Sequence, residues 1–130
     1  MRIHAITTAG LSPKTQKVQL YTKVRDLSSF GYLQRSSVKD LIKFVSRNAL
    51  PSLEQGTRCS ITEKNQMVHI LVSPKEKFAV YVFATLDYPK RLAYKVLHKT
   101  LDLFENNIGS GWKDQAGDKD FKISSIESLF

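Results

Sequence analysis

The chain has 130 residues, 42% of them apolar, which fits one folded domain with a core of its own rather than a disordered segment. Cys59 is the only cysteine, so an intrachain disulfide is excluded and a reducing compartment is expected. No apolar run approaches the roughly 18 residues of a membrane span, and the N-terminus lacks the apolar core of a signal peptide. The composition therefore predicts a soluble, cytoplasmic, single domain.

The net charge of +8 is unevenly divided along the chain. Residues 1–100 carry 17 Lys and Arg against 6 Asp and Glu, whereas residues 101–130 carry 3 against 6. A basic body can attract nucleic acid, anionic lipid or an acidic protein. The lysines are spread along the sequence, however, and no RNA-binding aromatic signature accompanies them. A solvated basic surface is the favoured interpretation, with no nucleic acid as a partner.

Two short strands are predicted near the N-terminus. Residues Arg2–Thr8 alternate in part between apolar and polar side chains, and Val18–Val24 alternate clearly. The turn-forming segment between them contains Gly10 and Pro13, so the two strands are close enough to form a hairpin.

An amphipathic helix is predicted over residues 35–50. Its apolar residues recur at helical spacing on one face: Val38, Leu41, Ile42, Val45 and Ala49. Ser37 followed by Asp40 resembles a capping box at the start, and Pro51 marks the end. Phe44 departs from the pattern, because it projects about 120° from the centre of the apolar stripe.

The second half of the chain predicts three strands and a long helix. The strands are Thr57–Glu63, Met67–Ser73 and Lys77–Leu86. Turn-forming residues separate them, so an antiparallel meander is the simplest arrangement. Pro89 begins the helix, since a proline at the first helical position loses no hydrogen bond, and Asn106–Gly109 end it. Asp120–Phe130 form a short final helix.

The predicted order is therefore β-β-α-β-β-β-α, followed by the short helix. Only one helix connects the hairpin to the meander. We expect a five-stranded antiparallel sheet sandwiched by helices, which is an α+β fold.

Catalytic and metal-binding patterns are absent from the sequence. The three histidines show no metal-ligand spacing with Cys59, which is better interpreted as a small buried hydrophobe than as a nucleophile. The six glycines are scattered, so no phosphate-binding loop is formed. Asp114, Asp118 and Asp120 lie in a polar loop without apolar walls that would raise a carboxyl pKa. We expect no enzyme, no metal and no cofactor.

Two interpretations of Phe44 remain open. Its ring covers a neighbouring loop or the last helix within the domain, or it belongs to an exposed apolar groove that a partner covers. Leu41 lies on the same side of the helix, and the strand at residues 57–63 can supply the opposite wall of such a groove.

Three segments resemble the longin domain at the N-terminus of R-SNARE proteins, in particular of the lipid-anchored, synaptobrevin-like members without a transmembrane helix. They are FGYLQRSSV, GTRCSITEKNQMVHILV and LDYPKRLAYKVLHKTLDLF, and the resemblance covers nearly all of residues 1–130. Its most specific parts are RSSV and the pattern Asp87, Tyr88, Pro89, Arg91, Ala93 and Tyr94. The resemblance implies the longin (profilin-like) fold. In it, a five-stranded antiparallel sheet carries one helix on one face and two on the other, in the order β-β-α-β-β-β-α-α.

The resemblance also implies a regulatory module rather than a catalyst. In the family this domain folds back on the SNARE motif of its own parent protein, helps targeting, and helps to shield a farnesyl or palmitoyl chain, giving a closed cytosolic form. The implied groove lies between the first helix and the third strand, and its aromatic contact falls on Phe44. The residues assigned to this groove are Leu41, Phe44, Val45, Cys59 and Ile61.

The chain ends at Phe130 without a heptad-repeat SNARE motif or terminal cysteines. We therefore expect an excised N-terminal domain. Its parent is expected to pair with cognate SNARE proteins in ER–Golgi transport and membrane fusion. It would reach Golgi, ER, vesicle or endosomal membranes only through its lipid anchor. The alternatives are a free-standing longin-like subunit of a tethering or coat complex, and a basic nucleic-acid or lipid-surface binder.

Overall fold

The computed structural model describes residues 1–130. Its strands are β1 Ile3–Leu11, β2 Val18–Arg25, β3 Arg58–Glu63, β4 Gln66–Val72 and β5 Phe78–Thr85. Its helices are α1 Arg35–Asn48, α2 Lys90–Asn107 and α3 Ser124–Glu127, with 3₁₀ segments η1 Leu50–Ser52 and η2 Gly109–Asp114. The predicted order and the α+β class are confirmed. None of the helices combines the length and the apolar character that a bilayer crossing requires.

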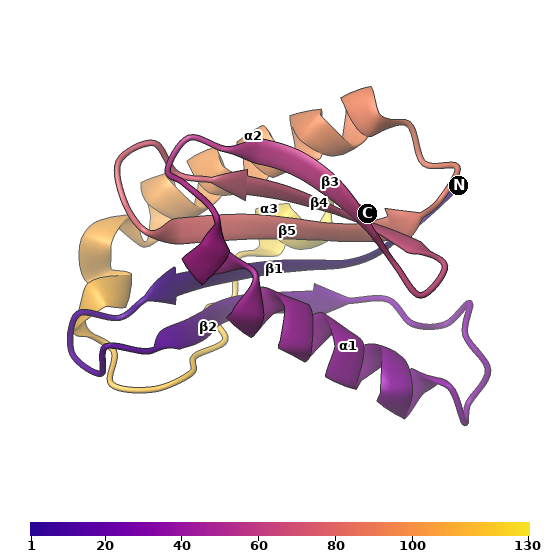
Figure 1. Ribbon diagram of the computed structural model, residues 1–130, viewed down its shortest axis with the longest axis horizontal. Coiled ribbons are helices and arrows are strands. Elements are labelled where there is room, and N and C mark those ends of the chain that lie inside the picture. Colours follow the sequence, from indigo (N-terminus) through magenta and orange to yellow (C-terminus); the bar gives the residue numbers. More distant parts are fainter.

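The five strands form one antiparallel sheet in the order β2-β1-β5-β4-β3 (Figure 1). β1 and β2 pair as the predicted hairpin, and β3, β4 and β5 form the predicted meander. The hairpin and the meander join where β1 pairs with β5. The central position of β5 explains why its sequence, FAVYVFAT, is apolar on both faces.

The sheet separates two hydrophobic cores. On one face, Ile42 of α1 packs in a cluster with Tyr81 and Phe83 of β5. On the other face, Leu97 and Phe104 of α2 form a second cluster with side chains of the sheet, η2 and α3. In Figure 1, α1 lies in front of the sheet and α2 and α3 lie behind it. One helix on one face and two on the other is the expected longin arrangement.

The first strand continues to Leu11, past the predicted end at Thr8. Gly10 was interpreted as part of a turn, but it pairs with both β2 and β5 inside the sheet. The absence of a side chain at Gly10 instead lets aromatic rings pack closely against its backbone. A Cβ atom at Gly10 would lie 2.9 Å from Cζ3 of Trp112 and 3.0 Å from Cδ2 of Phe78.

The predicted capping box at Ser37 and Asp40 is wrong. α1 begins at Arg35, so Ser37 lies inside the helix, and the N-cap residue Gln34 makes no side-chain capping bond. The Oε1 atom of Gln34 instead accepts the backbone N–H of Gly31 at 3.2 Å. The side chain at the helix start therefore stabilises the preceding loop rather than the first turn.

Residues 118–122 run along the outer edge of β2. The backbone N–H groups of Lys119 and Phe121 donate to carbonyl groups of β2, each at 2.8 Å. This extended segment replaces the first part of the predicted helix at Asp120–Phe130, so that α3 is a single turn. It also covers one edge of the sheet, which leaves β3 as the open edge.

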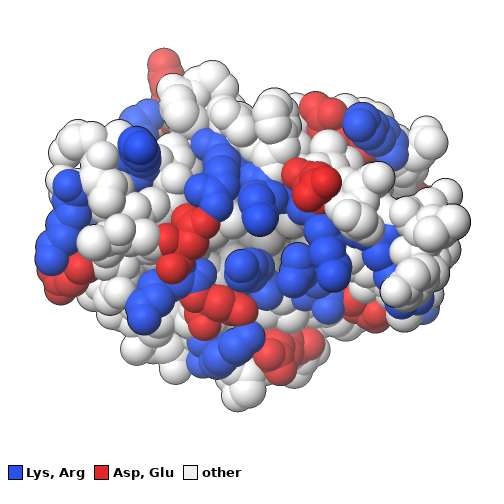
Figure 2. Space-filling view, turned by 90° about the horizontal axis from the view of Figure 1, so that it is seen from below, with Lys and Arg blue, Asp and Glu red and all other residues white.

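Basic side chains predominate on the β2 side of the molecule, with acidic side chains among them (Figure 2). Figure 2 looks at this side from below the view of Figure 1 and shows Asp and Glu among Lys and Arg. Arg47 of α1 forms an ion pair with Asp118, and Lys122 pairs with Asp120 at 2.7 Å. Two of the cations on this side are therefore locally neutralised.

We predict that Gly10→Ala lowers the free energy of unfolding by about 1–3 kcal/mol, because the added methyl group must displace a packed aromatic ring. Gly117→Ala is the matched control, since a Cβ atom there meets nothing within 4 Å. It should change stability by less than about 0.5 kcal/mol. Urea denaturation measures both, and equal midpoints would contradict the packing at Gly10.

Stability should also depend on pH through two buried histidines, His4 and His69. Burial is the main cause that lowers the pKa of each, with Arg2 adding to it for His4 and Lys90 for His69. The unfolded chain therefore binds protons near pH 6.5 that the folded chain resists. Stability is full above that pH and falls as the pH drops through it. The urea midpoint should be lower at about pH 5.5 than at about pH 7.5, and the difference should shrink in His4→Gln/His69→Gln. An undiminished difference in that variant would exclude these histidines as the cause.

Candidate partner-binding groove

A buried hydrogen bond fixes the rotation of α1 on the sheet. The hydroxyl oxygens of Ser46 and of Thr7 in β1 lie 2.7 Å apart, and both side chains are buried. Ile42 and Val45 point to the same side, into the core. At 3.6 residues per turn, this rotation turns Phe44 away from the sheet, and 65% of the residue is exposed. Its ring is therefore not buried against a loop or against the last helix.

Two adjoining hollows lie beside α1 and share Leu41. One has a volume of about 450 Å³ and lies between Phe44 and the end of β3 at Glu63. The other, of about 410 Å³, extends toward the loop before α1. We call the combined surface the α1 groove. Its apolar side chains are Phe30, Leu33, Val38, Leu41 and Phe44.

One face of the edge strand β3 belongs to the face of the sheet that α1 covers. Cys59 is half-buried against the α1-side core, and Ile61, two residues along the strand, is 37% exposed. Burial raises the pKa of the Cys59 thiol, which keeps it protonated and a poor nucleophile. The turn into β4 has positive φ angles of 45° at Lys64 and 66° at Asn65, as a tight two-residue hairpin requires. This turn holds the end of β3 beside the groove.

The structure places the five predicted groove residues on one side of the sheet but not in one hollow. Leu41 and Phe44 line the hollow beside α1 together. Cys59 and Ile61 lie further along β3 and do not line it. Val45 is 5% exposed and belongs to the core beneath, so a partner can contact it only slightly.

Phe30 and Leu33 were missed from the sequence. Their segment shows neither helical nor strand periodicity, so no helix, strand or site was predicted there. The available signal was the run FGYL, which carries three large apolar side chains in a loop. In the structure Tyr32 is 84% and Leu33 is 89% exposed. The ring of Phe30 packs on that of His4, with 4.6 Å between the centroids.

The groove contains no arrangement suited to metal binding, and no three His, Cys, Asp or Glu side chains elsewhere in the chain form one. What the site offers is an apolar strip with charged residues at its rim. Asp40, Glu63 and Lys64 supply that rim. Such a surface fits the binding of an amphipathic partner.

Comparison with known proteins defines the class of this chain. A family model named Longin, described as a regulated-SNARE-like domain, matches residues 27–126. The chain therefore belongs to the longin family, whose SNARE-like members serve membrane trafficking and are not enzymes.

Several curated proteins are similar over most of the chain. The VAMP-like protein YKT61 of Arabidopsis thaliana is 28% identical over 118 residues, 91% of this chain and 58% of that protein. The synaptobrevin homolog ykt6 of Schizosaccharomyces pombe is 28% identical over 117 residues, 89% of this chain and 58% of that protein. The synaptobrevin homolog YKT6 of Candida glabrata is 33% identical over 87 residues, 67% of this chain and 42% of that protein. The predicted resemblance to a synaptobrevin-like longin domain is confirmed, and the chain spans about three fifths of the first two relatives.

We predict that Phe44→Glu changes the free energy of unfolding by less than about 0.5 kcal/mol, because the ring is exposed. Ile42→Ala, in the same helix but in the core, should cost about 2–5 kcal/mol. Urea denaturation of both variants measures the contrast. A loss in Phe44→Glu as large as that in Ile42→Ala would assign Phe44 to the core.

Proposed function

We propose that residues 1–130 form the regulatory longin domain of an R-SNARE, and that the α1 groove docks an amphipathic SNARE segment of the same protein. Docking keeps that protein closed until a cognate SNARE competes for the segment. The observation that carries this proposal is Phe44, a ring that is 65% exposed beside Leu41 on an otherwise regular amphipathic helix.

The shape of the groove supports a helical or extended peptide as occupant. Leu41 and Phe44 are one helical turn apart, and Leu33 continues the apolar strip beyond the start of α1. An amphipathic segment with apolar residues at intervals of three and four can place one side chain on each. The charged rim, with Asp40 and Lys64, then stays in contact with water.

The energetics suit a switch rather than a permanent complex. Burying one phenylalanine side chain stabilises the closed form by roughly 1.5–3 kcal/mol. Within one chain, that energy shifts the ratio of closed to open forms by about one to two orders of magnitude. The tethered segment achieves this by effective concentration, without tight intrinsic binding. A competing partner can therefore release it.

The same groove can accept a lipid chain. Phe30 and Leu33 widen the apolar strip toward the loop before α1, where a farnesyl or palmitoyl chain finds more apolar surface. A single lipid chain gives only reversible membrane binding, so shielding it would release the protein from Golgi, ER, vesicle or endosomal membranes. The lipid anchor then returns to the membrane when the SNARE segment leaves the groove.

An NMR titration of the labelled domain tests this function. The probes are a synthetic peptide with an R-SNARE heptad sequence and, separately, farnesyl-cysteine methyl ester. We expect chemical-shift changes clustered around Leu41, Phe44 and Glu63, because these residues line one hollow. The changes should be lost in Phe44→Glu.

Leu86→Glu is the matched control, since Leu86 is an apolar residue that is 55% exposed outside the groove. It should bind both probes as the unmodified chain does. Unchanged binding in Phe44→Glu would refute the assigned anchor. An absence of shifts with both probes would refute self-docking and favour an outside protein, as expected for a tethering or coat subunit.

A further inference from the structure

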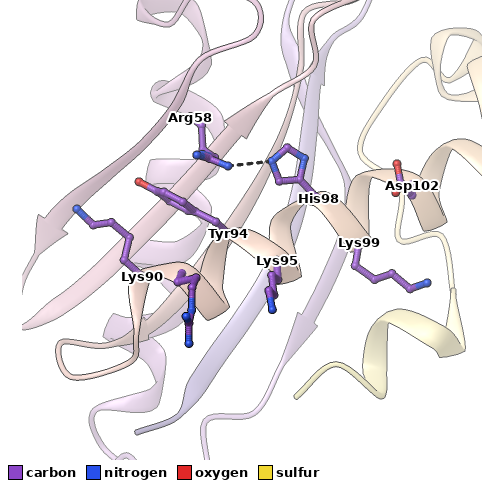
Figure 3. A pocket seen from close by; sticks show the side chains of 8 residues that line it. Arg58, Lys90, Tyr94, Lys95, His98, Lys99 and Asp102 are labelled. Carbon is purple, nitrogen blue, oxygen red and sulfur yellow. Dashed lines mark hydrogen bonds between the residues drawn. The ribbon is translucent and has the colours of Figure 1, made fainter.

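A second surface, on the opposite face of the sheet from the α1 groove, is strongly basic. It is an open hollow of about 630 Å³ along the exposed side of α2, next to the β3 edge (Figure 3). Five cationic side chains line it, and we call them the α2 basic patch: Arg58, Lys90, Arg91, Lys95 and Lys99. Asp102 is the only carboxylate of the hollow. Three of the lysines that look scattered in the sequence therefore gather on one surface.

The cations of the α2 basic patch have no acidic partners within the chain. The ion pairs of the structure involve other residues. On the β2 side, by contrast, Arg47 and Lys122 pair with aspartates. The positive charge along α2 is thus available to an external anion.

The positions of these cations oppose the usual electrostatics of a helix. Lys90 and Arg91 occupy the first turn of α2, at the positive end of the helix dipole, and that turn has no acidic residue. Arg91, Lys95 and Lys99 follow at four-residue spacing, so that neighbouring charges repel. Both effects destabilise the unoccupied helix, and a bound anionic surface relieves both. Basic residues that oppose these electrostatic preferences of a helix point to a functional surface.

Arg58 is held in place on the strand beside the helix. Its guanidinium carbon lies 4.3 Å from the centre of the Tyr94 ring, and its Nη1 lies 3.3 Å from Nε2 of His98 (Figure 3). The hydroxyl oxygen of Tyr94 lies 3.2 Å from that of Ser60, which in turn lies 2.7 Å from Nδ1 of His69. This chain of contacts orders the arginine before any ligand arrives, so less entropy is lost on binding.

We propose that the α2 basic patch binds the anionic headgroups of a membrane surface. Arg91, Lys95 and Lys99 form a row that extends about 12 Å along one helix face, and such rows of Lys and Arg recognise anionic bilayers. Tyr94 is the only hydrophobic residue of the hollow, which therefore lacks the apolar pocket that would anchor a peptide side chain. The patch can act while the α1 groove is occupied, since the two lie on opposite faces.

This contact adds to the lipid anchor, which was expected to be the only link to the membrane. Each Lys or Arg near an anionic surface strengthens association roughly fivefold. Five such residues give reversible binding that weakens as salt screens the charges. The patch would orient the domain on a membrane to which the anchor already holds the protein.

Sedimentation with lipid vesicles tests the proposal. The 130-residue chain is mixed with vesicles of phosphatidylcholine alone, or of phosphatidylcholine with phosphatidylserine. We compare it with Lys95→Glu/Lys99→Glu and with the control Lys39→Glu/Lys43→Glu. The control pair has the same spacing and charge change on the exposed side of α1. Binding should require phosphatidylserine, fall with salt, weaken at least roughly 25-fold in the α2 variant and persist in the α1 variant.

Three results would overturn the proposal. They are no binding to phosphatidylserine vesicles, an equal loss in both double variants, and α2-dependent binding of a polyglutamate peptide without vesicle binding. The first result excludes a membrane as the ligand. The second shows that the net charge of the chain, not the α2 basic patch, determines binding. The third indicates that the ligand is an acidic protein. Lys95→Gln/Lys99→Gln replaces the α2 variant if that one fails to fold, as judged by circular dichroism. Phe44→Glu should bind vesicles normally, which separates this test from that of the groove.

Discussion

The rotation of α1 about its own axis decides what this domain presents to a partner. Ile42 and Val45 face the core, and the hydrogen bond between Ser46 and Thr7 closes on the same side. Turning the helix would leave two buried hydroxyl groups unpaired, at about 1–3 kcal/mol each, and would expose apolar area as well. Phe44 therefore cannot reach the core without unfolding its surroundings. Its exposure is imposed by packing, not by a flexible loop.

The sequence predicted those features that repeat along the chain. The period of two in the strands and of about 3.6 in α1 located the strands along the chain, their grouping into a hairpin and a meander, and the outward position of Phe44. Features of the fold that do not follow from a repeating sequence pattern were missed. Gly10 signalled a turn because glycine usually does, although here it admits the Trp112 ring. Phe30 and Leu33 lie in a loop, and their part in the groove depends on where that loop folds.

The basic patch shows why charge is hard to interpret from sequence. Lys95 and Lys99 look like ordinary surface lysines until helical spacing aligns them with Arg91, and Arg58 joins them only because β3 lies beside α2. The domain thus has two distinct faces. One is apolar and, in the proposed function, holds a segment of the same protein. The other is cationic and is proposed to face the membrane, so closing and positioning use separate surfaces.

The central claim is that Phe44 is exposed to water in the free domain and is buried against apolar side chains of the bound segment in the complex. Fluorine NMR of the chain labelled only at Phe44 with 4-fluorophenylalanine measures this directly, through the change in fluorine shift between H₂O and D₂O. We predict a large solvent isotope shift in the free domain, because 65% of Phe44 is exposed. The shift should largely disappear when an R-SNARE heptad peptide is added. A small isotope shift in the free domain, or an unchanged one with saturating peptide, would contradict the claim.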